Sequence, residues 1–233
     1  MKRLALLGVA CYLVAVLLGF PAALALRWFA PDAFAMQSPE GSVWRGSTQA
    51  ASYGSYYLGA TQWRIQPLSL LRGRLAYRIQ AQAPDGLIKG VFAMSPTGTV
   101  HVSDLSGVAS MQSLASVLPD ELPAKMFQGR AQFKLDELQL AEGWPQAAHG
   151  QVALVDLVLT TPVEALGSYA MELAGGDGEP IRGSFHDTAG ALEIKGTITL
   201  NPDRTYALQC TARARPEASD NVKASVGLIC PKS

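Results

Sequence analysis

The chain has 233 residues, of which 19 are Lys or Arg and 19 are Asp or Glu, so it carries no formal net charge at pH 7. A chain of this length can bury one sizeable domain, and its neutral balance excludes a protein that binds nucleic acid through a strongly basic surface. The same balance argues against a polybasic lipid-binding surface.

The N-terminus joins two basic residues to a long apolar segment. Lys2 and Arg3 precede an uncharged run from Leu4 to Leu26. As an α-helix this run would be about 34 Å long, which is enough to cross a hydrocarbon core of about 30 Å. Because basic residues tend to stay in the cytoplasm, we expect a cytoplasmic start at 1–3, a transmembrane helix at 4–26, a linker at 27–40 and an exported β domain at 41–233.

The alternative is a cleaved signal peptide, since Ala23-Leu24-Ala25 has the small-x-small pattern of a cleavage site. Both interpretations export the bulk of the chain. Cys210 and Cys230 would then lie in an oxidising space, where we expect them to form a disulfide. Two free thiols are the alternative, and Cys11 is most simply an apolar side chain within the hydrophobic segment.

The exported part has the pattern of a meander of short strands. From Gly41 onward, turn-forming Gly, Pro, Asn and Asp recur about every ten residues, and apolar residues alternate with polar ones between them. The clearest predicted strands are 73–80, 131–136 and 192–200. Two segments are predicted to be helical, namely 110–118, which ends before Pro119, and a closing helix that begins at Asp220. The pattern therefore predicts a mainly β, antiparallel domain.

No residue pattern in the sequence indicates catalysis or metal binding. His101, His149 and His186 are far apart and lie in turn-like or strand-edge contexts, and Gly175–Gly178 is more typical of a hairpin turn than of a calcium loop. The acids considered for general acid–base chemistry lie on alternating strands, where the polar face is expected to carry charge: Asp136, Glu137 and Asp156. We predict no catalytic residue, no cofactor and no metal ion.

Short motifs of aromatic, Gly, Pro and Leu residues recur instead, each of which alone is explained by core packing. The first contains Gly41, Val43, Trp44 and Gly46. The second contains Trp63, Pro67, Leu70, Leu71, Gly73 and Leu75. The third contains Leu166, Gly167 and Tyr169, followed by Asp187, Gly190 and Leu192. In this order, and over nearly the whole chain, the motifs resemble the type II secretion system protein N family.

The resemblance implies a single-pass protein of the bacterial inner membrane with a periplasmic domain. Its fold would be a strongly curved antiparallel sheet with one or two short helices, similar to AsmA-type domains, whose sheets form a half-open groove. Its function would be that of a non-catalytic accessory or scaffold component in the export of folded proteins across the outer membrane, with other inner-membrane subunits of the apparatus as partners. The first motif would join the anchor to the sheet, with its glycines permitting the turn.

The alternative function is that of a periplasmic lipid-binding or lipid-transfer protein, because an apolar groove in a curved sheet could hold an acyl chain. The two functions differ in the expected state of the inner face. Its predicted residues either line an open trough or are covered by the helix at 110–118: Leu75, Tyr77, Ile79, Phe133 and Leu135.

Overall fold

The computed structural model describes residues 19–29, 34–115, 123–161, 163–216 and 218–220, together with Gly8, Tyr12, Val16 and Lys223. The described chain forms one sheet of 13 strands. The strands are β1 (Phe34–Gln37), β2 (Glu40–Gly41), β3 (Arg45–Tyr53), β4 (Tyr56–Ile65), β5 (Leu75–Ala83), β6 (Gly86–Met94), β7 (Val100–Ser110), β8 (Phe127–Ala141), β9 (Trp144–Thr160), β10 (Val163–Ala174), β11 (Ile181–Ala189), β12 (Leu192–Leu200) and β13 (Tyr206–Ala214). The short helices are α2 (Ala22–Phe29), α3 (Pro67–Leu70), α4 (Met111–Ala115) and the 3₁₀-helix η1 (Pro123–Met126).

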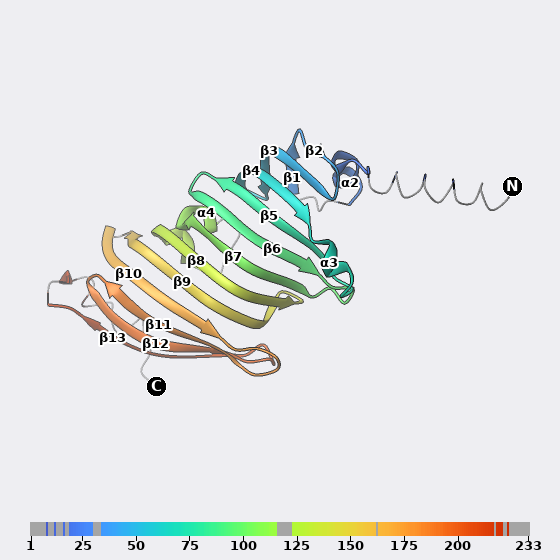
Figure 1. The fold of residues 1–233 in the computed structure, drawn as a ribbon. Coiled ribbons are helices and arrows are strands. Elements are labelled where there is room, and N and C mark those ends of the chain that lie inside the picture. The colour runs from blue at the N-terminus through green and yellow to red at the C-terminus, as the bar shows by residue number, and fades with distance from the viewer. Residues whose placement is uncertain are drawn as a thin grey trace.

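Each strand from β3 to β12 pairs antiparallel with the next one along the chain, and β1 and β2 both pair with β3. Figure 1 shows the resulting open sheet, whose long strands curve side by side from the α2 end to β13. The connections can be short because sequential strands are neighbours. At the β8–β9 turn, Glu142 and Gly143 both have positive φ (50° and 77°), the conformation of a tight two-residue hairpin.

The predicted antiparallel β architecture with a few short helices is confirmed. The strand predicted at 192–200 is β12, the one predicted at 131–136 lies within β8, and the one predicted at 73–80 overlaps β5. The helix predicted at 110–118 is present as α4, and residues 116–118 lie outside the described residues. Most of the predicted closing helix also lies outside them, although the Lys223 amide donates a helical hydrogen bond to the Ser219 carbonyl.

The strand register gathers apolar side chains on one face of the sheet. Ile65 lies opposite Tyr77, Tyr77 opposite Phe92, and Phe92 opposite Val102. Opposing residues of an antiparallel pair share a face, so these four side chains form one row across β4 to β7. Arg64 and Arg78, each one residue away from this row, belong to the other face. We call the two faces the apolar face and the polar face.

The core is small for a chain of this length. Most of the buried apolar residues are alanines, and the largest fully buried side chains are Ile181 and Leu192. A single sheet has no second layer to cover its apolar face, and α4 is the main described element that packs on it. Much of the apolar face therefore stays partly exposed.

The chain leaves its N-terminal segment at the β3 end of the sheet. Pro21 forms an isolated antiparallel bridge with Ser42, and the Val43 amide donates a hydrogen bond of 3.0 Å to the Phe20 carbonyl. The predicted transmembrane helix at 4–26 lies mostly outside the described residues, and α2 begins within it at Ala22. Among the described residues, no helix has both the length and the apolar character to cross a bilayer.

Candidate functional site

A large apolar hollow lies on the apolar face between β8 and β13. It has a volume of about 560 Å³, which is within the usual range of ligand pockets. We call it the apolar trough. Its walls are almost entirely hydrophobic and consist of Phe127, Val152, Leu154, Leu157, Leu166, Tyr169, Ala170, Met171, Phe185, Leu192, Ile194, Ile198, Leu208 and Cys210.

One row of paired residues forms the floor of the trough. Val152 lies opposite Met171, which lies opposite Phe185, and Phe185 lies opposite Gly196. A Cβ atom on Gly196 would lie 2.6 Å from the Phe185 ring, so the ring fills the space above this glycine. The row ends at Cys210, which lies opposite Gly196 on the last strand.

Helix α4 closes one end of the trough. Met111 and Ala115 pack with Ala131 and Leu157 in a buried cluster, against which Phe127, Leu154, Leu166 and Tyr169 also pack. The predicted inner-face residues outside this cluster are half-buried or, in the case of Leu75, exposed: Leu75, Tyr77, Ile79, Phe133 and Leu135. The helix at 110–118 therefore does not bury these five residues, and none of them lines the apolar trough.

Asp85 holds α4 in place from the β5–β6 turn. Its carboxylate accepts hydrogen bonds of 2.9 Å from the Ser110 amide and from the Ser113 hydroxyl, and the Ser113 amide donates to the Ser110 hydroxyl, which caps the helix. Burial of the carboxyl alone would raise the pKa of Asp85. The hydrogen bonds from Ser110 and Ser113 outweigh it and lower the pKa below its ordinary value.

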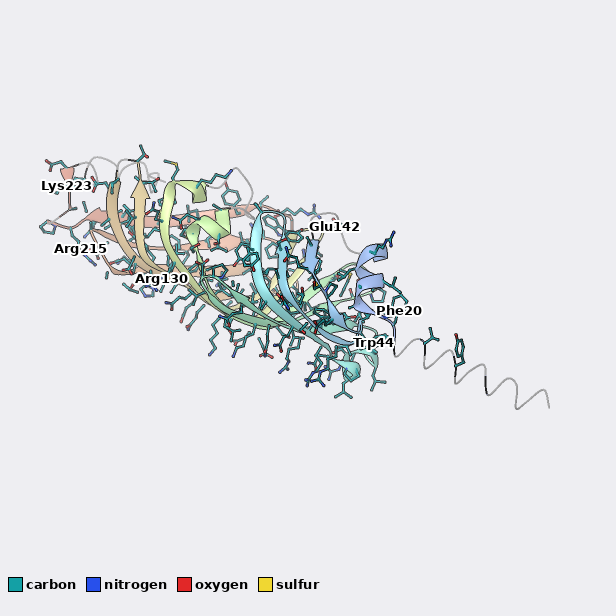
Figure 2. The ribbon with its side chains drawn as sticks, turned by 90° about the horizontal axis from the view of Figure 1, so that it is seen from above. Phe20, Trp44, Arg130, Glu142, Arg215 and Lys223 are labelled. Atoms are coloured by element: carbon teal, nitrogen blue, oxygen red, sulfur yellow. The ribbon has the colours of Figure 1, made fainter. Side chains whose placement is uncertain are left out.

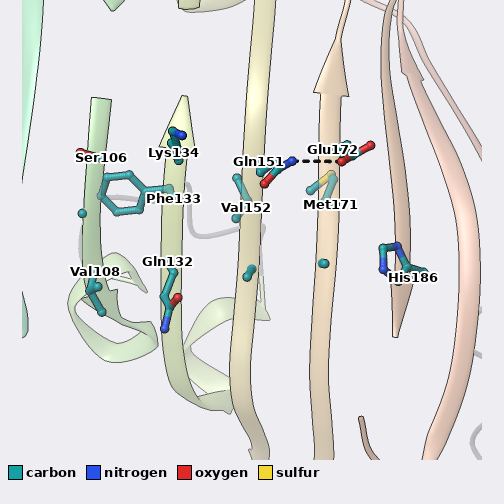
Figure 3. Close-up of a pocket in the computed structure, with 13 residues that line it drawn as sticks. Ser106, Val108, Gln132, Phe133, Lys134, Gln151, Val152, Met171, Glu172 and His186 are labelled. Carbon is teal, nitrogen blue, oxygen red and sulfur yellow. Dashed lines mark hydrogen bonds between the residues drawn. The ribbon is translucent and has the colours of Figure 1, made fainter. Parts of the chain in front are cut away.

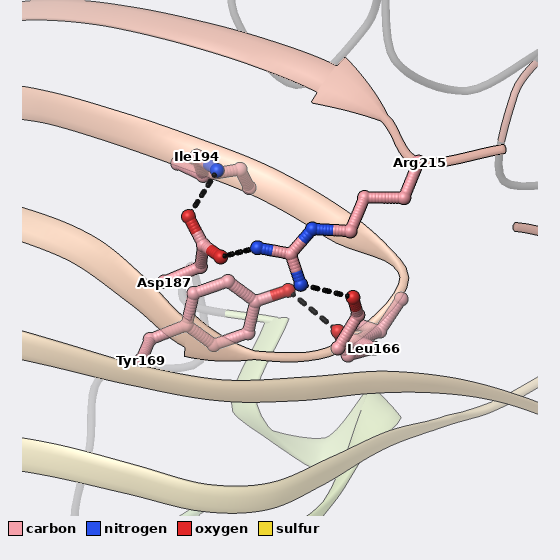
Figure 4. Close-up of polar contacts among 6 residues, drawn as sticks. Leu166, Tyr169, Asp187, Ile194 and Arg215 are labelled. Atoms are coloured by element: carbon pink, nitrogen blue, oxygen red, sulfur yellow. Dashed lines mark hydrogen bonds and ion pairs between the residues drawn. The ribbon is translucent and has the colours of Figure 1, made fainter. Parts of the chain in front are cut away.

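The third sequence motif assembles into a polar clasp at the α4 end of the trough (Figure 4). The Tyr169 hydroxyl donates to the Leu166 carbonyl (2.9 Å), and Asp187 accepts from the Ile194 amide (3.0 Å). Arg215 pairs with Asp187 and donates to the Gly190 carbonyl (2.7 Å). Burial raises the pKa of Tyr169, the Asp187 charge raises it further and the Arg215 charge opposes this. A hydroxyl that stays protonated keeps donating to Leu166.

The two glycines of this motif are required by a close approach between the backbones of β10 and β11. A Cβ atom on Gly167 would lie 2.0 Å from the Ala189 carbonyl oxygen, and one on Gly190 would lie 2.3 Å from the Leu166 carbonyl oxygen. Both residues also have positive φ angles. Leu192, the last residue of the motif, is buried beside Ala218. The motif therefore builds the end of the sheet.

The first two motifs meet at the opposite end of the sheet. The Trp63 indole donates to the Ser42 carbonyl (3.1 Å), and its ring lies over Gly46, where a Cβ atom would approach it to 2.3 Å. The Ile65 amide donates to the Trp44 carbonyl (2.7 Å). Pro67 occupies the first turn of α3. The remaining residues of the second motif form a turn with exposed leucines: Leu70, Leu71, Gly73 and Leu75.

Comparison with known proteins gives a match over most of the chain. The profile of the family described as Type II secretion system (T2SS), protein N matches residues 33–232. The chain belongs to the type II secretion system protein N family. The protein of that name from Aeromonas hydrophila is 24% identical over 225 residues, covering 94% of this chain and 88% of the relative. The one from Vibrio cholerae serotype O1 is 23% identical over 198 residues, covering 83% of this chain and 77% of the relative. No solved structure matches the chain.

Membership in the protein N family supports a role as a component of type II secretion. The polar face of this family member carries a second hollow of about 430 Å³, which is lined by residues of β7 to β11. Figure 3 shows Lys134, Glu172 and His186 around it, and the Gln151 amide donates to Glu172 (3.0 Å). These side chains are solvated at the surface, as expected on the polar face of a strand.

The acids and histidines considered for catalysis or metal binding do not form one cluster in the described structure. Asp156 pairs with Arg130 at 3.6 Å and Glu137 with His149 at 4.0 Å, all with exposed side chains. Burial and the Arg74 charge lower the pKa of His101 despite the opposing Glu137 charge. Within the described ranges, no three His, Cys, Asp or Glu residues are grouped in a way that could hold a metal ion.

Sequence reasoning missed two residues that organise this site. Arg215 completes the clasp although it lies 28 positions after Asp187, and Asp85 holds α4 from 25 positions before Ser110. Neither sits in a recognisable motif, so no local signal could have found them. The predicted disulfide joins Cys210 of the trough to Cys230, and Cys230 lies outside the described residues.

Proposed function

We propose that this chain is a non-catalytic accessory or scaffold subunit of the type II secretion apparatus, anchored in the inner membrane with its sheet in the periplasm. The observation that carries the proposal is the use of the family motifs. The first two form the junction at the β3 end, and the third forms the clasp at the other. Motif residues that shape a surface, rather than surround a reacting atom, fit a protein that supports other subunits.

The junction gives the proposed anchor a mechanical role. Phe20 and Pro21, which lie within the predicted anchor, are bound to Val43 and Ser42 through the backbone, so the anchor would be coupled directly to the sheet. Trp63 stabilises the same turn through its indole bond to Ser42. A scaffold subunit needs such coupling, because a loose tether would leave its orientation to the membrane undefined.

The test is co-purification of the full chain from membranes, with the native secretion genes present. We expect inner-membrane subunits of the apparatus to be recovered with the tagged chain, and secretion to fall when the gene is deleted. Asp187→Ala should disturb the clasp and reduce both the recovery of these subunits and secretion. Glu193→Ala, at an exposed position of β12, should reduce neither. Recovery of the chain without any secretion subunit, together with unchanged secretion in the deletion strain, would refute the proposal.

Lipid binding in the apolar trough is the second candidate, and the open, hydrophobic hollow of about 560 Å³ favours it. Native mass spectrometry of the detergent-extracted chain would then reveal bound lipid. Leu208→Glu places a charge on the exposed rim of the trough, while Gln209→Glu places one on the polar face of the same strand. Loss of lipid only in the Leu208 variant supports this function, and an absence of lipid in the unchanged chain contradicts it.

A further inference from the structure

A cluster of exposed leucines lies at the junction end of the sheet. Leu68 and Leu71, in and beside α3, are 77% and 85% exposed, and Leu70 and Leu75 are also exposed. Met94, which lies opposite Leu75 on β6, extends the cluster. Large apolar side chains grouped in this way at a turn are uncommon on a soluble surface and mark an interaction site. We call these five residues the leucine tip.

Five arginines that form no ion pair in the described structure lie near the leucine tip, two of them in the turn and three on the polar face, opposite the face that carries Leu75 and Met94. Arg72 and Arg74 lie within the turn, and Arg45, Arg64 and Arg78 lie side by side on the adjoining strands, since Arg64 is opposite both of the others. All five are exposed, and none forms an ion pair with another residue of the described ranges. Like charges placed opposite each other destabilise a sheet, so this arrangement is unfavourable unless an anionic partner neutralises it.

The charge of the chain is divided along the sheet. Residues 1–94 contain nine Lys or Arg and three Asp or Glu, whereas residues 95–233 contain ten and sixteen. The basic part corresponds to the N-terminal segment and β1 to β6, and the acidic part to the remaining strands. A molecule with this polarity would be drawn to an anionic surface by its junction end and repelled from it by its far end.

The N-terminal apolar segment meets the sheet at the end that carries the leucine tip. The Phe20 carbonyl accepts from Val43, the Trp44 carbonyl accepts from Ile65, and α3 begins two residues after Ile65. Figure 2 shows Phe20 and Trp44 together at this end of the ribbon, and Figure 1 shows α2 and α3 at the same end of the sheet. A bilayer that received the N-terminal apolar segment would therefore lie close to the leucine tip.

We infer that the leucine tip and its arginines form a second membrane contact, in which the leucines enter the interface of an anionic bilayer and the arginines bind its lipid phosphates. The leucines match the apolar layer of such an interface and the arginines match its charged headgroup layer. Phosphate is a preferred partner of the guanidinium group. This contact rests on the proposed membrane attachment. One hydrophobic helix alone would leave the sheet free to rotate about the helix axis, whereas two membrane contacts fix the orientation of the sheet.

The test uses the full chain in nanodiscs made with brominated acyl chains, which quench tryptophan fluorescence on contact. Leu71→Trp places a probe in the leucine tip. Leu87→Trp is the matched control, because Leu87 is 50% exposed and lies at the opposite end of β6 from Met94. After subtraction of the native tryptophan signal, we expect quenching in the Leu71 variant and none in the Leu87 variant. The double substitution Arg72→Gln and Arg74→Gln should abolish that quenching in discs that contain phosphatidylglycerol.

Equal quenching of the two probes, or none at position 71, overturns the inference. A protein occupant of the leucine tip would show itself as crosslinking of position 71 to a secretion subunit in native membranes, without quenching in nanodiscs, and that outcome also overturns it. Failure of the proposed function is a separate result. If the chain is retained in the nanodisc and co-purifies with secretion subunits while position 71 stays unquenched, only the second membrane contact is wrong.

Discussion

Arg215 pairs with Asp187 across 28 positions of sequence and thereby fastens the end of β13 to β11. The Asp187 side chain is only 8% exposed, and Arg215 is the ion-pair partner of its carboxylate. Two hydrogen bonds lie beside this ion pair, one from the Tyr169 hydroxyl to the Leu166 carbonyl and one from the Ile194 amide to Asp187. The C-terminal edge of the open sheet, which lacks a further strand in the described structure, is stabilised there instead.

Arg215→Ala should destabilise the fold by roughly 1–3 kcal/mol, because it leaves a buried carboxylate and the Gly190 carbonyl without their donor. The matched control is Arg204→Ala. Arg204 pairs with Glu142 at side-chain exposures of 55% and 80%, and such a surface pair contributes about 1 kcal/mol or less. Chemical unfolding of the two variants measures the difference. Equal losses would show that the clasp is no stronger than a surface ion pair.

Gly190→Ala should reduce the free energy of unfolding by about 2 kcal/mol or more, since the added Cβ would lie 2.3 Å from the Leu166 carbonyl oxygen. Gly178→Ala is the control, because it introduces backbone strain without a clash. Gly178 also has a positive φ, and no atom lies within 4 Å of its Cβ position. The unfolding midpoint of the Gly190 variant should be the lower of the two, and the reverse order would contradict the proposed close approach.

Asp85→Ala should loosen α4 and cost about 0.5–2 kcal/mol at neutral pH, as the loss of a helix cap does. The folded pKa of Asp85 is lowered, so its stabilising contribution is present above the unfolded pKa and is lost as the pH falls through the folded pKa. The difference in melting temperature between the variant and the unchanged chain should therefore shrink at acid pH, below about 4. Asp136→Ala, at an exposed position on β8, is the control. If the difference in melting temperature is the same at neutral and at acid pH, the Asp85 carboxylate is not its source.

The N-terminal segment should be retained in the mature protein. Cleavage after Ala25 would remove Phe20 and Pro21, whose backbone contacts hold Val43 and Ser42. Intact-mass analysis of protein extracted from membranes decides between the two forms. A mature chain that begins at Leu26 would disprove the anchor.

Cys210 and Cys230 should be linked in protein taken from the periplasmic side. Nineteen residues separate them, and closing a loop of that size stabilises the fold by roughly 3 kcal/mol. Replacement of both by Ser should lower the melting temperature, whereas Cys11→Ser should not. Peptide mapping without reductant should recover the linked segments, and alkylation of both thiols in the oxidised protein would rule out the bond.

Local pattern was sufficient to predict a meander of strands and to place three of them, β5, β8 and β12, in whole or in part. Leu192–Leu200 alternates apolar and polar residues, and it forms β12 with that alternation, because side-chain direction in a strand depends only on position parity. The glycine and aromatic motifs identified the family for a related reason. Gly46, Gly167 and Gly190 in these motifs lie at close contacts, where a Cβ atom would approach a neighbouring atom to 2.3 Å or less.

Contacts between distant positions could be decided only by the tertiary structure. The pairing of Asp187 with Arg215, and of Asp85 with Ser110, depends on which turns lie together after the sheet has formed. The grouping of Arg45, Arg64 and Arg78 likewise depends on the register of β3, β4 and β5. The sequence determined that the charges of the whole chain cancel, and this balance argued against a basic membrane-facing surface. The strand order separates those charges along the sheet, because consecutive strands lie side by side and carry the composition of each sequence segment to its own place in space.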